Sequence, residues 1–142
     1  MRDAWPDPES EGSGGRFALG EVARGRWGVV LVVWQGHRCK VQEVLQDEGE
    51  VTQDDYDAAV RALALAAEFG PSHHPARVKK IRSSSKRLWE LCPTKHLRVT
   101  CTLAGRQIVL LTAFYKTKQK TPKNEIDRAE RLRRQLEDEG VL

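Results

Sequence analysis

The chain has 142 residues, 39% of them hydrophobic and 31% charged, and its 24 basic and 20 acidic side chains give a formal net charge of +4. That length fits one domain with one core. No apolar run approaches the roughly 18–20 residues that cross a bilayer, and the acidic start of the chain lacks the pattern of a secretory signal. The three cysteines are odd in number and far apart, which excludes a disulfide framework and favours a reducing, cytoplasmic compartment.

The charge is divided unevenly along the chain. Residues 1–76 contain seven basic and thirteen acidic side chains, whereas residues 77–142 contain seventeen basic and seven acidic ones. Between Arg77 and Lys123 there are thirteen basic residues and a single acid, Glu90. A concentrated cationic surface attracts phosphate backbones through counterion release, so nucleic acid is the partner that this half of the chain favours. A well-solvated basic surface is the alternative.

Residues 1–25 are predicted to form a flexible tail, because they are rich in Gly and Pro and show no hydrophobic periodicity. The ordered domain is predicted to span residues 26–142. Its first strand is expected at Gly28–Trp34, which is β-branched and apolar on both faces. Residues 39–45 either extend a strand or begin a connection.

A helix is predicted from Thr52 to Phe69. Thr52 is a good N-cap residue, and the pair Gly70–Pro71 ends the helix. Its apolar stripe is expected to pack on a sheet through Tyr56, Val60, Leu63 and Ala67.

The remaining chain is predicted to contain a loop, three strands and a helix. The loop covers residues 71–86, and the strands cover residues 88–91, 97–103 and 106–115, with a turn at Ala104–Gly105. A helix capped by Thr121, with Pro122 as its first residue, runs to about Glu139 and buries Ile126, Ala129, Leu132 and Leu136. This order predicts an α+β fold: a small, mostly antiparallel sheet packed by helices on one face.

Two features could carry chemistry. If the strand before them continues, Lys116, Lys118 and Lys120 share one face, and their mutual repulsion favours a bound anion between them. Arg98 lies within a predicted strand, and its planar guanidinium suits a phosphate, although it could instead pair with Glu90 on the neighbouring strand. The histidines and cysteines lack the spacing of a metal site, so we expect neither metal nor cofactor. His96, two residues from Arg98, is a weaker catalytic candidate.

The basic half of the chain resembles a known family. The segments Leu88-Trp89-Glu90-Leu91 and Leu97-Arg98-Val99, and then Phe114 to Ile126 with its Lys-Thr-Lys-Gln-Lys-Thr-Pro run, resemble the RelE/HigB superfamily of type II toxin–antitoxin toxins, in its phage-derived, HigB-like branch. The resemblance spans residues 78–136, and its specific part is residues 114–122. It departs from the family pattern at Cys92, commonly Arg, and at Thr112–Ala113, often His-Gly.

This resemblance implies a RelE-like toxin fold and a metal-independent mRNA endoribonuclease, an mRNA interferase that often acts on ribosome-bound mRNA. It implies neutralisation by a cognate antitoxin with a helix-turn-helix domain. Arg98, Lys116 and Lys118 are the implied catalytic residues, with Arg98 stabilising charge and one lysine acting as base. Contacts to RNA are expected from the basic loop, the strand end and the lysine run, at Lys79, Lys80, Arg82, Arg87, Tyr115 and Lys120. The alternatives are a ParE-like toxin that inhibits DNA gyrase and a non-catalytic relative that only binds its antitoxin.

Overall fold

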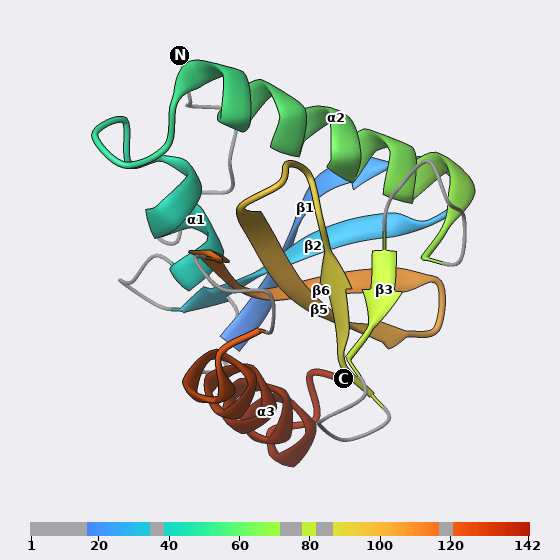
Figure 1. The fold of residues 1–142 in the computed structure, drawn as a ribbon. Helices are drawn as coiled ribbons and strands as arrows, with labels where there is room; N and C mark the ends of the chain where they lie inside the picture. The colour runs from blue at the N-terminus through green and yellow to red at the C-terminus, as the bar shows by residue number, and fades with distance from the viewer. Residues whose placement is uncertain (1–16, 35–38, 72–77, 82–86, 117–120) are drawn as a thin grey trace.

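The computed structural model describes residues 17–34, 39–71, 78–81, 87–116 and 121–142, and within them one sheet runs in the order β1-β2-β6-β5-β4-β3 (Figure 1). Its strands are β1 (Phe17–Arg24), β2 (Gly28–Trp34), β3 (Val78–Lys80), β4 (Trp89–Leu91), β5 (Leu97–Ala104) and β6 (Gln107–Tyr115). Neighbouring strands are antiparallel except for β2 and β6, which pair in parallel. The predicted α+β class with a mostly antiparallel sheet is confirmed.

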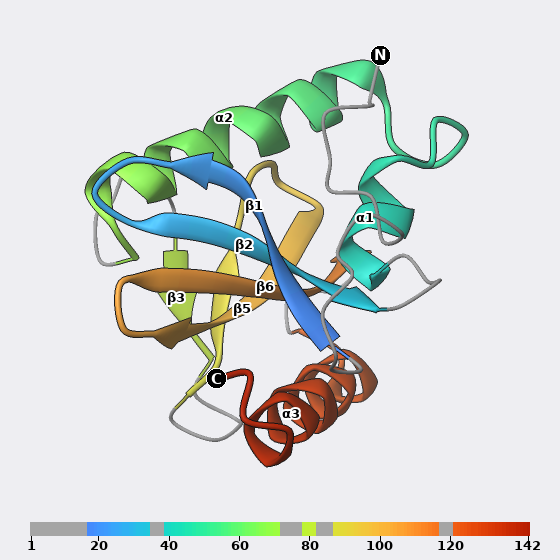
Figure 2. The same cartoon turned by 180° about the vertical axis from the view of Figure 1, so that it is seen from behind.

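Three helices pack against this sheet in the described part of the chain: α1 (Lys40–Leu45), α2 (Gln53–Phe69) and α3 (Lys123–Asp138). Figures 1 and 2 show α2 and α3 on opposite sides of the sheet, so the expectation of helices on one face is wrong. The sheet needs two covers because β2, β5 and β6 carry apolar or β-branched side chains on both faces, and residues 29–33 are all buried. No described helix is long and apolar enough to span a membrane.

Two edge strands lie where the sequence predicted none. Residues 17–24 form β1, inside the predicted tail, and pair antiparallel with β2 while Phe17 is buried in the core. Residues 78–80 form β3, inside the predicted loop, and pair with β4. Backbone pairing with a neighbouring strand defines both segments, and their own side-chain pattern does not reveal it. Residues 1–16 of the predicted tail lie outside the described residues.

The helices differ from the predictions in detail. Residues 39–45, for which the sequence allows either a strand extension or a connection, contain the short helix α1. Its N-cap is Cys39, whose thiol accepts a hydrogen bond from the Gln42 backbone N–H. In α2, Thr52 caps as predicted, but Val60 is 42% exposed and the buried stripe is richer in alanine: Tyr56, Ala59, Ala62, Leu63, Ala66 and Ala67. At the end of α2, Gly70 has φ +84°, and a Cβ there would lie 2.7 Å from Nε1 of Trp27, so only glycine fits.

Helix α3 begins one residue later than expected. Pro122 is its N-cap, without a side-chain cap bond, because the Thr121 hydroxyl donates to Glu90 on β4 instead. The predicted stripe is confirmed, since Ile126, Ala129, Leu132 and Leu136 are all buried against the sheet. The start of α3 is thereby fixed to the strand that carries Glu90.

Candidate functional site

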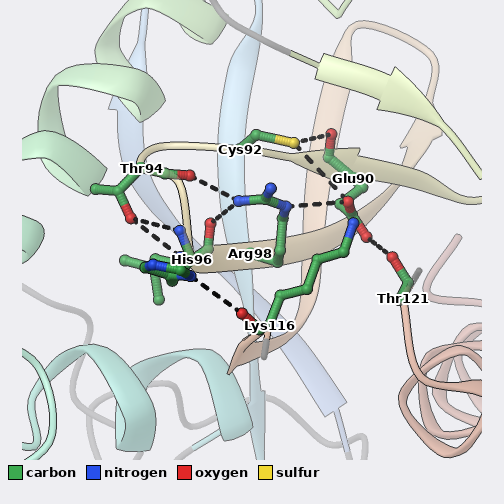
Figure 3. A network of polar contacts seen from close by, with 8 residues as sticks. Glu90, Cys92, Thr94, His96, Arg98, Lys116 and Thr121 are labelled. Atoms are coloured by element: carbon green, nitrogen blue, oxygen red, sulfur yellow. Dashed lines mark hydrogen bonds and ion pairs between the residues drawn. The ribbon is translucent and has the colours of Figure 1, made fainter. Parts of the chain in front are cut away.

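Strand register brings several polar side chains to one face of the sheet. Glu90 of β4 lies opposite Lys79 of β3 and Thr100 of β5, while Arg98 of β5 lies opposite Phe114 of β6. Directly paired residues point to the same face, and residues two apart on a strand do so as well. Lys79, Glu90 and Arg98 therefore share one face, and it is the face on which α3 lies, because Thr121 reaches Glu90 there (Figure 3). We call the cluster of Lys79, Glu90, Cys92, Arg98 and Lys116 the cationic cluster.

Arg98 is held inside this cluster by protein groups. Its Nη1 donates to the backbone carbonyls of Thr94, at 2.6 Å, and Leu97, at 2.9 Å. Its Nε lies 3.2 Å from Oε1 of Glu90, but the N–H is not aligned for a hydrogen bond, so this contact is an ion pair without one. Only 11% of the Arg98 side chain and 7% of the Glu90 side chain are exposed. The pairing with Glu90 that was the alternative for Arg98 is thus present.

Glu90 is the acidic centre of the cluster. One carboxylate oxygen faces Arg98, and the other accepts the hydroxyl of Thr121. The Cys92 thiol lies 3.8 Å from the same oxygen that faces Arg98. Burial raises the pKa of the Cys92 thiol, the charge of Arg98 acts in the opposite direction, and the charge of Glu90 raises this pKa further.

Lys116 follows the last residue of β6 and closes the cluster on the other side. Its backbone N–H donates to the His96 carbonyl at 2.6 Å, and the His96 ring nitrogen Nδ1 lies 3.3 Å from the Lys116 carbonyl. Figure 3 shows the Lys116 side chain extending along the sheet toward Glu90. The backbone of Lys116 is therefore fixed next to β5, and its long side chain extends toward the carboxylate that faces Arg98.

Other predicted residues lie elsewhere. Lys80 pairs with Trp89 on the opposite face of the sheet, where its ammonium lies 5.9 Å from the Trp89 ring centre. Tyr115 also faces away and donates to Asp55 of α2 at 2.9 Å. Arg87 lies toward the other end of β5 and donates to Glu137 of α3 at 2.6 Å. Arg82, Lys118 and Lys120 lie outside the described residues. The structure thus brings together Lys79, Arg98 and Lys116, but not Lys80, Arg87 or Tyr115.

The groups that hold Arg98 are hard to find from sequence. Glu90 is the alternative partner that the strand order predicts, whereas no pattern predicts the Thr94 carbonyl as a partner of Arg98 or the Thr121 hydroxyl as a partner of Glu90. The one signal was composition, because Glu90 is the single acid among the basic residues from Arg77 to Lys123. A lone carboxylate inside such a strand is expected to have a cationic partner, since a buried unpaired charge is costly.

The cationic cluster contains three cations and one carboxylate, so it keeps a net positive charge at one end of the sheet. Such an arrangement can bind an anion and stabilise negative charge that develops on it. Among the described residues, no group of three or more His, Cys, Asp or Glu side chains is placed to hold a metal ion.

Comparison with protein-family models gives one match. The model of the family described as "Phage derived protein Gp49-like (DUF891)" matches residues 49–134, more than half of the chain, and this range includes α2, the whole cationic cluster and most of α3. A search of curated proteins finds no match to the chain. The chain therefore belongs to the family of phage-derived Gp49-like proteins.

Proposed function

We propose that this protein is the toxin of a type II toxin–antitoxin system, and that it cleaves translated mRNA at the cationic cluster without a metal ion. The family match supports a toxin-like role, because phage-derived Gp49-like proteins are associated with toxin–antitoxin systems. A cognate antitoxin with a helix-turn-helix domain would neutralise it. An acidic antitoxin segment over the cluster would both speed association and block the substrate.

The observation that carries this proposal is the convergence of Arg98 and Lys116 on one face of the sheet, with Lys79 beside them. These cations come from three different strands or strand ends, so the fold and not the local sequence assembles them. RNA carries one negative charge for each phosphate, and a guanidinium with two neighbouring ammonium groups complements that charge.

The proposed reaction is transesterification within the RNA strand. The 2′-hydroxyl attacks its own 3′-phosphate and loses its proton to Lys116 or Lys118 in the neutral form. Arg98 stabilises the added negative charge on the crowded phosphorus, and a second protonated group gives its proton to the leaving 5′-oxygen. One P–O bond forms and one breaks, so the products are a 2′,3′-cyclic phosphate and a 5′-hydroxyl.

Induced expression in a bacterial host tests this proposal. We expect rapid loss of mRNA and blocked translation, and cleavage of RNA by the purified protein in the presence of EDTA. The double variant Arg98→Ala/Lys118→Ala should remove both effects. Arg61→Ala, which removes an exposed cation from α2 on the other side of the sheet, is the control and should remain toxic.

Other outcomes would point to the other two functions. Loss of DNA supercoiling with a DNA-damage response, and with intact mRNA, would indicate a ParE-like gyrase inhibitor. The absence of any growth effect, together with tight binding to the product of a neighbouring helix-turn-helix gene, would indicate a non-catalytic relative. Killing by the folded double variant would exclude Arg98 and Lys118 as the site.

A further inference from the structure

The guanidinium of Arg98 is held on two of its three nitrogens. Nε faces Glu90, and Nη1 donates to the backbone carbonyls of Thr94, which precedes β5, and of Leu97, its first residue. The third nitrogen, Nη2, makes no hydrogen bond or ion pair with any residue that the structure describes (Figure 3). Because a guanidinium is planar and rigid, fixing Nε and Nη1 also fixes the direction of the Nη2 donors.

We propose that Glu90 is a positioning residue that orients Arg98 so that Nη2 is the group offered to a phosphate of the RNA. This inference rests on the proposed function for the identity of the ligand, but the geometry behind it does not. Glu90 is itself fixed from the far side by the Thr121 hydroxyl and by its place in β4, so it provides a rigid support for Arg98.

A purely structural role for Glu90 has different consequences. If Glu90 only neutralised Arg98, its loss would lower the stability of the protein. The kcat and KM of the molecules that remain folded would then stay close to wild type. A positioning carboxylate acts on the orientation of the group that stabilises the transition state, so its loss lowers kcat more than it raises KM. Kinetics on folded protein separate these roles.

The kinetic experiment uses the full chain with Glu90→Ala, Glu90→Gln and a matched control. The control is Glu130→Ala, which removes another buried carboxylate from an ion pair, 3.5 Å from Arg133 on α3. For RNA cleavage we expect Glu90→Ala to lower kcat by about 10–100-fold and to change KM less than about threefold. Glu90→Gln, which keeps the shape of the side chain and a polar oxygen facing Nε, should recover at least a tenth of wild-type kcat. Equal kcat for Glu90→Ala and Glu130→Ala, corrected for folded fraction, would overturn the inference.

A second measurement does not depend on cleavage or on the stability of Glu90→Ala. Inorganic phosphate is titrated into ¹⁵N-arginine-labelled wild-type protein, and the Arg98 side-chain NMR signals are assigned by their loss in Arg98→Lys. We expect phosphate to shift the Nη2 signals and to leave the Nε–H signal in place. A shift of Nε–H alone would show that phosphate displaces Glu90, which contradicts the inference. Wild-type protein that cleaves no RNA but gives the Nη2 shift would refute the proposed nuclease function and leave the role of Glu90 intact.

Discussion

Arg98 and Glu90 form an ion pair between neighbouring strands, with Nε and Oε1 3.2 Å apart and both side chains almost fully buried. A buried pair of this kind adds little net stability over apolar residues, but removing one partner leaves a charge without compensation in a dry environment. The effect of removing one of these side chains on the free energy of unfolding therefore depends on whether the other is present.

We expect Glu90→Ala and Arg98→Ala each to lower the free energy of unfolding by about 3–5 kcal/mol, because each leaves one buried charge unpaired. The double variant should lose less than the sum of the two, with a coupling of about 1–3 kcal/mol. Urea denaturation of wild type, the two single variants and the double variant at one pH gives the free energies for this double-mutant cycle. Strict additivity would mean that the two side chains do not sense each other, which contradicts the ion pair.

Lys79 and Lys80 are neighbours in sequence but point to opposite faces of β3. Lys79 faces Glu90 and the cationic cluster, whereas Lys80 lies over Trp89. We expect Lys79→Ala to weaken binding of a non-cleavable 2′-O-methyl RNA and to reduce the slope of log Kd against log salt by about 0.7, the value for one phosphate contact to a single strand. Lys80→Ala is the matched control and should leave the slope unchanged. Equal effects of both would indicate diffuse attraction and no defined contact on the cluster face.

The difference between these two lysines marks the limit of what the sequence could predict. Strands β2, β5 and β6 and helices α2 and α3 were predicted within a few residues, because hydrophobic periodicity, a Thr N-cap and a Gly–Pro stop are local signals. β1 and β3 are edge strands, and their existence depends on pairing with a neighbour. Without β3 the alternation of Lys79 and Lys80 could not be known.

The candidate site was predicted in part for the same reason. Arg98 lies on one predicted strand and Lys116 directly follows the adjacent one, so their proximity follows from the fold class. Tyr115 is next to Lys116 in sequence, but the pleat turns it toward α2 and Asp55. The hydrogen bond between Thr121 and Glu90 joins residues 31 positions apart, and no local pattern contains that information.

Tyr115 gives a test of this division between the two faces. Its hydroxyl donates to Asp55 at 2.9 Å across the interface between the sheet and α2. We expect Tyr115→Phe to lower the free energy of unfolding by about 1–2 kcal/mol, since a hydrogen bond to a carboxylate is lost. RNA affinity should stay within about twofold of wild type, because the ring lies on the face away from Arg98. Loss of RNA affinity with unchanged stability would instead place Tyr115 in the RNA contact, as the sequence suggested.

The buried cysteines make stability depend on alkaline pH. Burial raises the pKa of Cys39 from 9.0 to about 11 and that of Cys101 from 9.0 to about 12. The folded protein therefore keeps these protons at a pH where the unfolded chain loses them, so their contribution is complete below pH 9 and decreases above it. Between pH 9 and pH 11 we expect the free energy of unfolding to fall by up to about 1.4 kcal/mol per pH unit for each thiol.

The variant Cys101→Ala isolates one of these thiols, because its packing cost is the same at every pH while its titration is removed. The free energy of unfolding is measured by urea denaturation under reducing conditions at several pH values from 7 to 10.5. At neutral pH we expect a lower value for Cys101→Ala than for wild type. Above pH 9 the value for the variant should fall less steeply with pH. Lysine and tyrosine titrations contribute equally to both proteins and cancel in the comparison. Parallel curves for the two proteins would mean that the Cys101 thiol ionises alike in the folded and unfolded chains, contrary to its complete burial on β5.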